Sequence, residues 1–208
     1  MYKEVQVLTH SSIKISKEIT IYLDPFHVKE EKKDADIICI THDHFDHYSP
    51  EDIAKVKNAS TVLVCPKSME ASLSNSGIDP EFIELVEAGD TLEINHVKIE
   101  VIAAYNVGKK FHPKENGWVG YVLTIDGTSY YVAGDTDINE DVEKVSCDLA
   151  LLPVGGTYTM TAEEAAKLAI TLSPKLAVPM HYGDIVGELA DAERFIKLLE
   201  GKVAAEIK

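Results

Sequence analysis

The sequence contains one stretch on which its fold assignment rests, Thr41-His42-Asp43-His44-Phe45-Asp46-His47. Four of its residues are potential metal ligands within a short loop, namely His42, His44, Asp46 and His47. His42 and His44 can point the same way from an extended segment, and Asp46 and His47 can point to an adjacent site. The spacing therefore predicts two neighbouring metal ions.

The ligand types indicate which metals fit. Imidazole and carboxylate groups are typical of divalent zinc, manganese and iron sites. No cysteine lies near the motif, which favours an open catalytic site over a closed structural zinc site. We expect two divalent ions, zinc in first place and manganese or iron as alternatives. Surface histidines that merely cap a helix would not explain three imidazoles in one polar loop.

The flanking residues place the motif at the end of a strand. Residues 36–40 form a continuous apolar run, as expected for a strand covered on both faces, and the motif follows directly. After it, Ser49-Pro50-Glu51-Asp52 combines an N-cap, a first-turn proline and early acidic residues, which predicts a short helix.

Two later residues also follow predicted strands. Asp135 comes after a hairpin over 118–132 that turns at Asp126-Gly127, and His181 comes after a strand at 176–180. Alone, Asp135 could be a turn residue and His181 a core histidine. Together with the motif, they are candidate ligands, because a carboxylate at a strand end can bridge two cations about 3.5–4 Å apart. Asp46 and Asp135 are the candidate catalytic carboxylates, able to orient a hydroxide or collect its proton.

These residues, in this order, resemble the metallo-β-lactamase superfamily. The resemblance covers essentially the whole chain, so we expect a single hydrolase domain over residues 1–208. Segments 23–26, 134–136, 152–160 and 179–182 look like the small single-domain branch of metal-dependent hydrolases that also contains L-ascorbate-6-phosphate lactonase.

The resemblance implies an α/β (α+β) fold, a four-layer αββα sandwich of two mixed β-sheets flanked by helices, with the site on their common edge. It also implies how the ligands are shared. His42 and His44 would bind one metal, the other would be bound by Asp46, His47 and His181, and Asp135 would lie between them.

One position departs from the family pattern. The superfamily usually supplies a third histidine to the first metal from the end of a middle strand, and the matching residue here is Asn106. His112, six residues further along the same loop, is the expected substitute. Asn106 itself or water could complete the site instead, or the protein could hold a lone metal.

The remaining pattern predicts alternating strands and helices. Strands are expected at 5–8, 12–15, 19–23, 61–64 and 203–207, a hairpin at 91–105, and helices at 67–75, 161–172 and 188–199.

Four weaker features are open to two interpretations each. Asp24 could accept a hydrogen bond from a ligating histidine or only start a turn, and His10 could line the mouth of the site or be a loop histidine. The amides of residues 155–158 could face an anionic substrate or only form a turn. Lys109, Lys110 and Lys114 could attract a phosphate or carboxylate, or be solvated.

Composition narrows the class of protein. The 208 residues are 45% apolar and 26% charged, which is typical of a soluble globular protein. Twenty Lys and Arg against 35 Asp and Glu give a net charge of −15, which disfavours nucleic acid and anionic membranes as partners. Three widely spaced cysteines suggest thiols in a reducing cytoplasm, and no apolar run is long enough to span a bilayer.

Together these features predict a metal-dependent hydrolase that uses a metal-bridged hydroxide to cleave an ester, a lactone or a phosphate-bearing small metabolite. The substrate could be anionic, and the protein could form a homo-oligomer. The alternatives are a nuclease or phosphodiesterase of the same superfamily, or a non-catalytic metal-binding protein.

Overall fold

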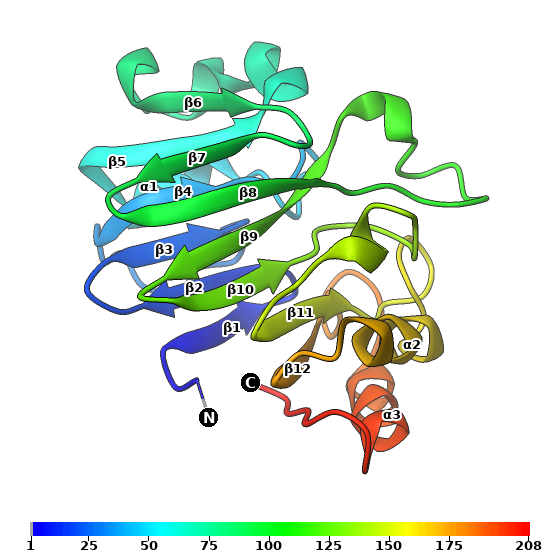
Figure 1. The fold of residues 1–208 in the computed structure, drawn as a ribbon. Coiled ribbons are helices and arrows are strands. Elements are labelled where there is room, and N and C mark those ends of the chain that lie inside the picture. The colour runs from blue at the N-terminus through cyan, green and yellow to red at the C-terminus, as the bar shows by residue number, and fades with distance from the viewer. Residues whose placement is uncertain (1) are drawn as a thin grey trace.

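The computed structural model describes residues 2–208 as two six-stranded sheets with helices on their outer sides (Figure 1). Residue 1, with which the expected domain begins, lies outside the described residues. The predicted α/β sandwich of two mixed sheets is confirmed.

Both sheets are ordered along the chain. The first has the order β1 (Val5–Thr9), β2 (Ser12–Ser16), β3 (Thr20–Leu23), β4 (Ala35–Cys39), β5 (Lys57–Pro66) and β6 (Ile83–Val86). The second has the order β12 (Leu176–Met180), β11 (Leu149–Pro153), β10 (Thr128–Val132), β9 (Val119–Ile125), β8 (Val97–Ala103) and β7 (Thr91–Ile94). The helices are α1 (Pro50–Val56), α2 (Ala162–Leu172) and α3 (Leu189–Leu199), with 3₁₀ turns η1 (Lys67–Asn75), η2 (Pro80–Phe82), η3 (Lys114–Asn116) and η4 (Val142–Lys144).

Strand β4 shows how the layers are held. Ile37 and Cys39 lie in the core shared with the second sheet, whereas Ile38 and Ile40 pack into a separate outer cluster with Ile53 of α1. Side chains alternate between the two faces of a strand, so an unbroken apolar run buries both faces. This confirms the prediction of a doubly covered strand before the motif.

Each sheet mixes parallel and antiparallel pairs. β3 to β6 are parallel, as are β10, β11 and β12, and the remaining pairs are antiparallel. Parallel neighbours end at the same edge, so the loops after β10 and β12 leave the second sheet together. The segments after β4, β10 and β12 carry the predicted site residues.

Two predicted elements differ in the structure. Residues 67–75 form a 3₁₀ helix, with no α-helical stretch. Residues 203–207 do not extend the sheet as a strand, because they contact β12 through one bridge between Ala177 and Ala205. The predicted hairpin turn at Asp126-Gly127 is confirmed. The predicted hairpin at 91–105 turns at Asn95-His96, and a capping box joins Thr161 and Glu164 at the start of α2.

Candidate metal centre

The predicted site residues converge at one end of the two sheets. Those of the motif lie in the loop between β4 and α1, while the others follow β8, β10 and β12. A further histidine joins them from the β1–β2 turn. All these side chains are buried except that of His44, which is half-buried. The residues that the structure brings together are His10, His42, His44, Asp46, His47, His112, Asp135 and His181.

The donor atoms of these residues form three overlapping groups. In each group, all ligand atoms lie within 4.8 Å of one another. The groups are His42, His44 and His112; His10, Asp46 and His181; and His42, His47 and Asp135. Clusters of this size and composition have the donors that divalent cations require.

Asp135 lies between the histidines. Its Oδ2 atom is 3.1 Å from Nε2 of both His112 and His181, and its Oδ1 atom is 3.3 Å from Nε2 of His47. One carboxylate therefore faces ligands from each side of the site. This is the geometry expected of a group that bridges two cations.

Several of these buried atoms have no hydrogen-bond partner. They include Nε2 of His47, His112 and His181 and Oδ1 of Asp135. Buried polar atoms are normally paired, and leaving one unpaired costs about 1–3 kcal/mol. Unpaired nitrogen and oxygen atoms that converge on one another fit a bound cation, so the residues present are compatible with metal.

Burial and neighbouring charges shift the pKa values of the candidate ligands in different directions. Burial lowers the pKa of His42 well below its ordinary value, which keeps the ring neutral and able to coordinate. Burial opposes the charge of Asp135, but His181 and His47 hold the pKa of that carboxyl well below its usual range. His47 behaves in the opposite way to His42. Although burial lowers its pKa, the carboxylates of Asp135 and Asp24 raise it well above the ordinary value.

Asp24 fixes the orientation of His47. The buried carboxylate accepts hydrogen bonds from Nδ1 of His47 at 2.7 Å and from the amide and hydroxyl of Thr41 at 2.8 and 2.6 Å. Nε2 of His47 is thereby directed toward Asp135. Of the two interpretations of Asp24, the structure supports the hydrogen bond to a candidate ligand.

Asn106 holds His112 in the site. The Oδ1 atom of Asn106 accepts a hydrogen bond from the His112 amide at 3.1 Å and lies 3.1 Å from Nδ1 of the ring. Its Nδ2 atom donates to the Tyr158 carbonyl at 2.9 Å. His112 is thus a buried residue whose Nε2 atom faces Asp135. Asn106, which stands where the family usually has a histidine, therefore holds His112, the expected substitute ligand, in place.

His10 lies inside the cluster of candidate ligands, closer to the centre than the sequence alone indicates. It is buried, its Nε2 atom lies 3.3 Å from Oδ2 of Asp46, and its carbonyl accepts a hydrogen bond from the His181 amide at 2.9 Å. The available signal was its place immediately after a strand, the same criterion that selected Asp135 and His181.

The segment after β11 is fitted closely to His181. A Cβ atom on Gly155 would lie 2.6 Å from the His181 carbonyl oxygen and 3.1 Å from its Nδ1 atom, so no side chain fits there. The amide of Gly156 donates to Met160, and that of Thr157 donates to Gly155. Because these amides donate to carbonyls within the same turn, the structure favours a purely structural turn over a site that binds an anionic substrate.

A pocket of about 230 Å³ opens onto the candidate centre and is called the metal-side pocket. Beyond five of the candidate ligands, it is lined by Phe45, Phe111, Tyr158 and Ile185. Two lysines of the long loop pair with carboxylates outside the pocket lining. Lys109 pairs with Asp137 at 2.6 Å, and Lys114 pairs with Asp141 at 3.2 Å.

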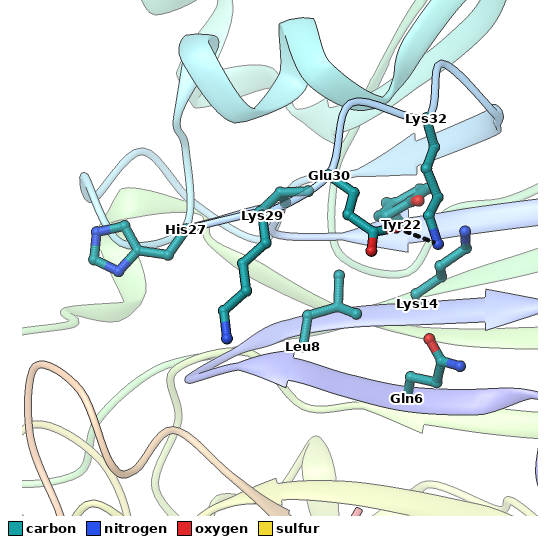
Figure 2. Close-up of a pocket in the computed structure, with 9 residues that line it drawn as sticks. Gln6, Leu8, Lys14, Tyr22, His27, Lys29, Glu30 and Lys32 are labelled. Atoms are coloured by element: carbon teal, nitrogen blue, oxygen red, sulfur yellow. Dashed lines mark ion pairs between the residues drawn. The ribbon is translucent and has the colours of Figure 1, made fainter.

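A second pocket, of about 250 Å³, lies on the outer face of β1 to β3 and is called the lysine pocket (Figure 2). Lys14, Lys29 and Lys32 line it, together with Glu30 and Tyr22. Figure 2 shows the ion pair between Glu30 and Lys32, which measures 2.9 Å.

The fold and the cluster of imidazoles and carboxylates define a class of protein, the metal-dependent hydrolases of the β-lactamase superfamily. Residues 4–181 match a family model described as a beta-lactamase superfamily domain. A UPF0173 metal-dependent hydrolase from Thermococcus onnurineus is 35% identical, with 96% of this chain and 93% of that protein covered. The chain belongs to this family of UPF0173 metal-dependent hydrolases and is an enzyme.

Solved structures agree. A metal-dependent hydrolase from Parabacteroides distasonis is 32% identical, with 98% of this chain and 91% of that chain covered, at a TM-score of 0.82. Igni18, a metallo hydrolase from Ignicoccus hospitalis, is similar in fold, with 23% identity, 98% and 94% coverage and a TM-score of 0.78. The superfamily prediction is confirmed, and the link to the ascorbate-phosphate lactonase stays a prediction.

Two further sequence expectations concern the cysteines and membranes. Cys39 and Cys65 are buried and Cys147 is half-buried, and all three are free thiols. Burial raises the pKa of Cys65 to about 12, so this thiol is inert at neutral pH. Within residues 2–208, no helix is long and apolar enough to cross a membrane.

Proposed function

We propose that the enzyme holds two divalent ions, zinc in first place, and hydrolyses a carboxylic ester or lactone of a small metabolite. The observation that carries this proposal is the position of Asp135 between buried imidazole nitrogens that converge on its carboxylate without regular hydrogen bonds. His42, His44 and His112 would bind one ion, and Asp46, His47 and His181 the other, with Asp135 shared. Manganese and iron suit the same donors.

Divalent ions at such a site supply a hydroxide nucleophile at neutral pH and polarise the oxygen of the substrate's reacting group. The chain's own residues do the rest. Asp46 and Asp135 accept hydrogen bonds from the attacking water and collect its proton, since both carboxylates face the cluster and line the metal-side pocket. Asp24 keeps the ring of His47 oriented through its Nδ1 atom, and Asn106 does the same for His112.

The test combines metal analysis with turnover. Purified protein is expected to contain two equivalents of metal, to hydrolyse p-nitrophenyl esters and to lose activity with a chelator. Cleavage of bis-p-nitrophenyl phosphate without ester hydrolysis would instead indicate the phosphodiesterase alternative. A single tight equivalent would contradict the two-ion site.

The remaining expectations follow from composition. With a net charge of −15, we infer a small-molecule substrate. From the three free cysteines we infer a cytoplasmic location. Self-association stays a prediction that light scattering of the purified protein tests.

A further inference from the structure

We propose that the metal-side pocket binds an uncharged, apolar acyl group of the substrate, so that the enzyme prefers neutral esters with an alkyl or aryl tail to anionic ones. This inference rests on the proposed ester hydrolysis and adds the substrate class. It contrasts with the expectation from the lysine-rich loop that a phosphate or carboxylate is attracted.

The first argument is the character of the pocket wall. Phe45 is 66% exposed, Phe111 47% and Ile185 40%, although large apolar side chains are normally buried. Both exposed phenylalanines among the described residues line this one pocket. Such gathered apolar surface beside a reactive centre indicates a ligand that covers it.

The second argument is the arrangement of the wall. Its members come from three separate loops and from the turn after β11. The rings of Phe111 and Tyr158 meet edge to face, with centroids 4.8 Å apart. Phe45 contacts Phe26 in the same manner at 6.2 Å. These ring contacts support Phe45 and Phe111 in the wall of the pocket.

The third argument is charge. No lysine or arginine is among the described residues that line the pocket. Lys109 donates to the carboxylate of Asp137 and to the Thr159 carbonyl, both at 2.6 Å, so its charge is already compensated. A carboxylate or phosphate at the far end of the substrate tail, away from the candidate metal ligands, would face Phe45, Phe111 and Ile185 instead of a cationic side chain, which is unfavourable.

The volume of the metal-side pocket limits the size of the acyl group that it can bind. A cavity of about 150 Å³ accommodates benzene. The metal-side pocket, at about 230 Å³, has room for a six-carbon tail or a ring next to the reacting carbonyl.

The experiment compares two substrates that differ only in the end of the acyl chain. With the metal-loaded enzyme, kcat/KM for p-nitrophenyl hexanoate is expected to exceed that for mono-p-nitrophenyl adipate by at least about 10-fold, since only the latter carries a remote carboxylate. Phe111→Ala is expected to lower kcat/KM for the hexanoate about 10-fold, mainly through KM, and to lower kcat/KM for p-nitrophenyl acetate by a clearly smaller factor.

Ile185→Ala and Ile170→Ala provide a matched pair, because the two isoleucines are 40% and 42% exposed and only Ile185 lines the pocket. The first is expected to weaken hexanoate hydrolysis and the second to have no effect. Equal kcat/KM for hexanoate and adipate, or equal losses for acetate and hexanoate in Phe111→Ala, would overturn the proposal.

A binding measurement separates this inference from the proposed function. Trp118 is the single tryptophan, and its ring lies 4.7 Å from that of His44 and 5.4 Å from that of His112. Its fluorescence is expected to report hexananilide binding at least about 5-fold tighter than binding of adipic acid monoanilide, and Phe111→Ala removes the difference. If the metal-loaded protein hydrolyses no ester but keeps this preference, ester hydrolysis fails and the apolar pocket stands. Equal affinities would refute the pocket assignment alone.

Discussion

The metal-side pocket and the lysine pocket are similar in size and opposite in chemistry. In the lysine pocket two of the three lysines have carboxylate partners, because Lys14 contacts Asp34 at 2.6 Å and Lys32 contacts Glu30 at 2.9 Å. Tyr22 also donates to Asp34, at 2.8 Å. At the candidate centre, buried imidazole nitrogens remain unpaired. The contrast teaches that an accumulation of charge is a weaker sign of function than polar atoms left without partners.

The largest effect is expected from the shared carboxylate. Asp135→Asn keeps the shape but removes the charge that faces His112 and His181, so we expect kcat/KM to fall at least about 1,000-fold. Metal content should drop below two equivalents, as measured by elemental analysis. Asp34→Asn, the control in the other region, should leave both quantities unchanged. Full metal content with normal turnover in Asp135→Asn would remove the basis of the site.

A smaller effect is expected from the residue that holds His112. Asn106→Ala removes the amide between His112 and Tyr158, and such supporting groups are worth about 10- to 100-fold in metal affinity. Titration of the metal-free protein with zinc measures this loss. His27→Ala provides the comparison, since His27 lines the lysine pocket. Unchanged zinc affinity in Asn106→Ala would show that His112 needs no such support.

His10 should have a more modest role. His10→Ala frees Oδ2 of Asp46 from its neighbour at 3.3 Å, and we expect about a 10-fold weaker affinity for one of the two ions. His96→Ala is the matched control, because the His96 side chain is fully exposed. A loss of both ions together would instead indicate that His10 supports the whole cluster.

The smallest effect is expected in the lysine pocket. Burial raises the pKa of Asp34, but hydrogen bonds from Lys14 and Tyr22 outweigh it and lower that pKa below its ordinary value. The pair therefore stabilises the fold above the ordinary carboxyl pKa, and this contribution is lost as the pH falls through the lowered value. Lys14→Met should cost less than about 1 kcal/mol at neutral pH, because Asp34 is partly exposed.

Urea unfolding at pH 7 and at pH 3 measures this difference, which should shrink at the lower pH. Activity of Lys14→Met should stay within about 2-fold of the parent. A substantial loss of turnover in Lys14→Met would show that the lysine pocket contributes to catalysis, contrary to the difference proposed between the two pockets.

The sequence predicted the contiguous part of the site best. The four candidate ligands of the motif are close in the chain, so local spacing already constrains them. Asp135 and His181 were predictable because strand ends in parallel sheets meet at one edge. His112 followed from the asparagine at the expected histidine position.

The rest depends on contacts between distant segments. The position of His10 after a strand marks it as a candidate, but it joins the site only because the β1–β2 turn contacts the loop after β12. No local pattern encodes that contact. The pocket wall is similar, since Phe45, Phe111 and Ile185 belong to loops whose mutual approach is decided by packing. Residues 203–207 have the composition of a strand, but they pair with β12 at a single bridge.

Two residues of the pocket wall are direct sequence neighbours of candidate metal ligands. Phe45 stands between His44 and Asp46, and Phe111 directly precedes His112. Coordination that fixes these imidazoles also fixes the rings next to them. An enzyme preparation short of metal should therefore discriminate poorly between substrates as well as turn over slowly, so that fidelity and cation occupancy rise and fall together.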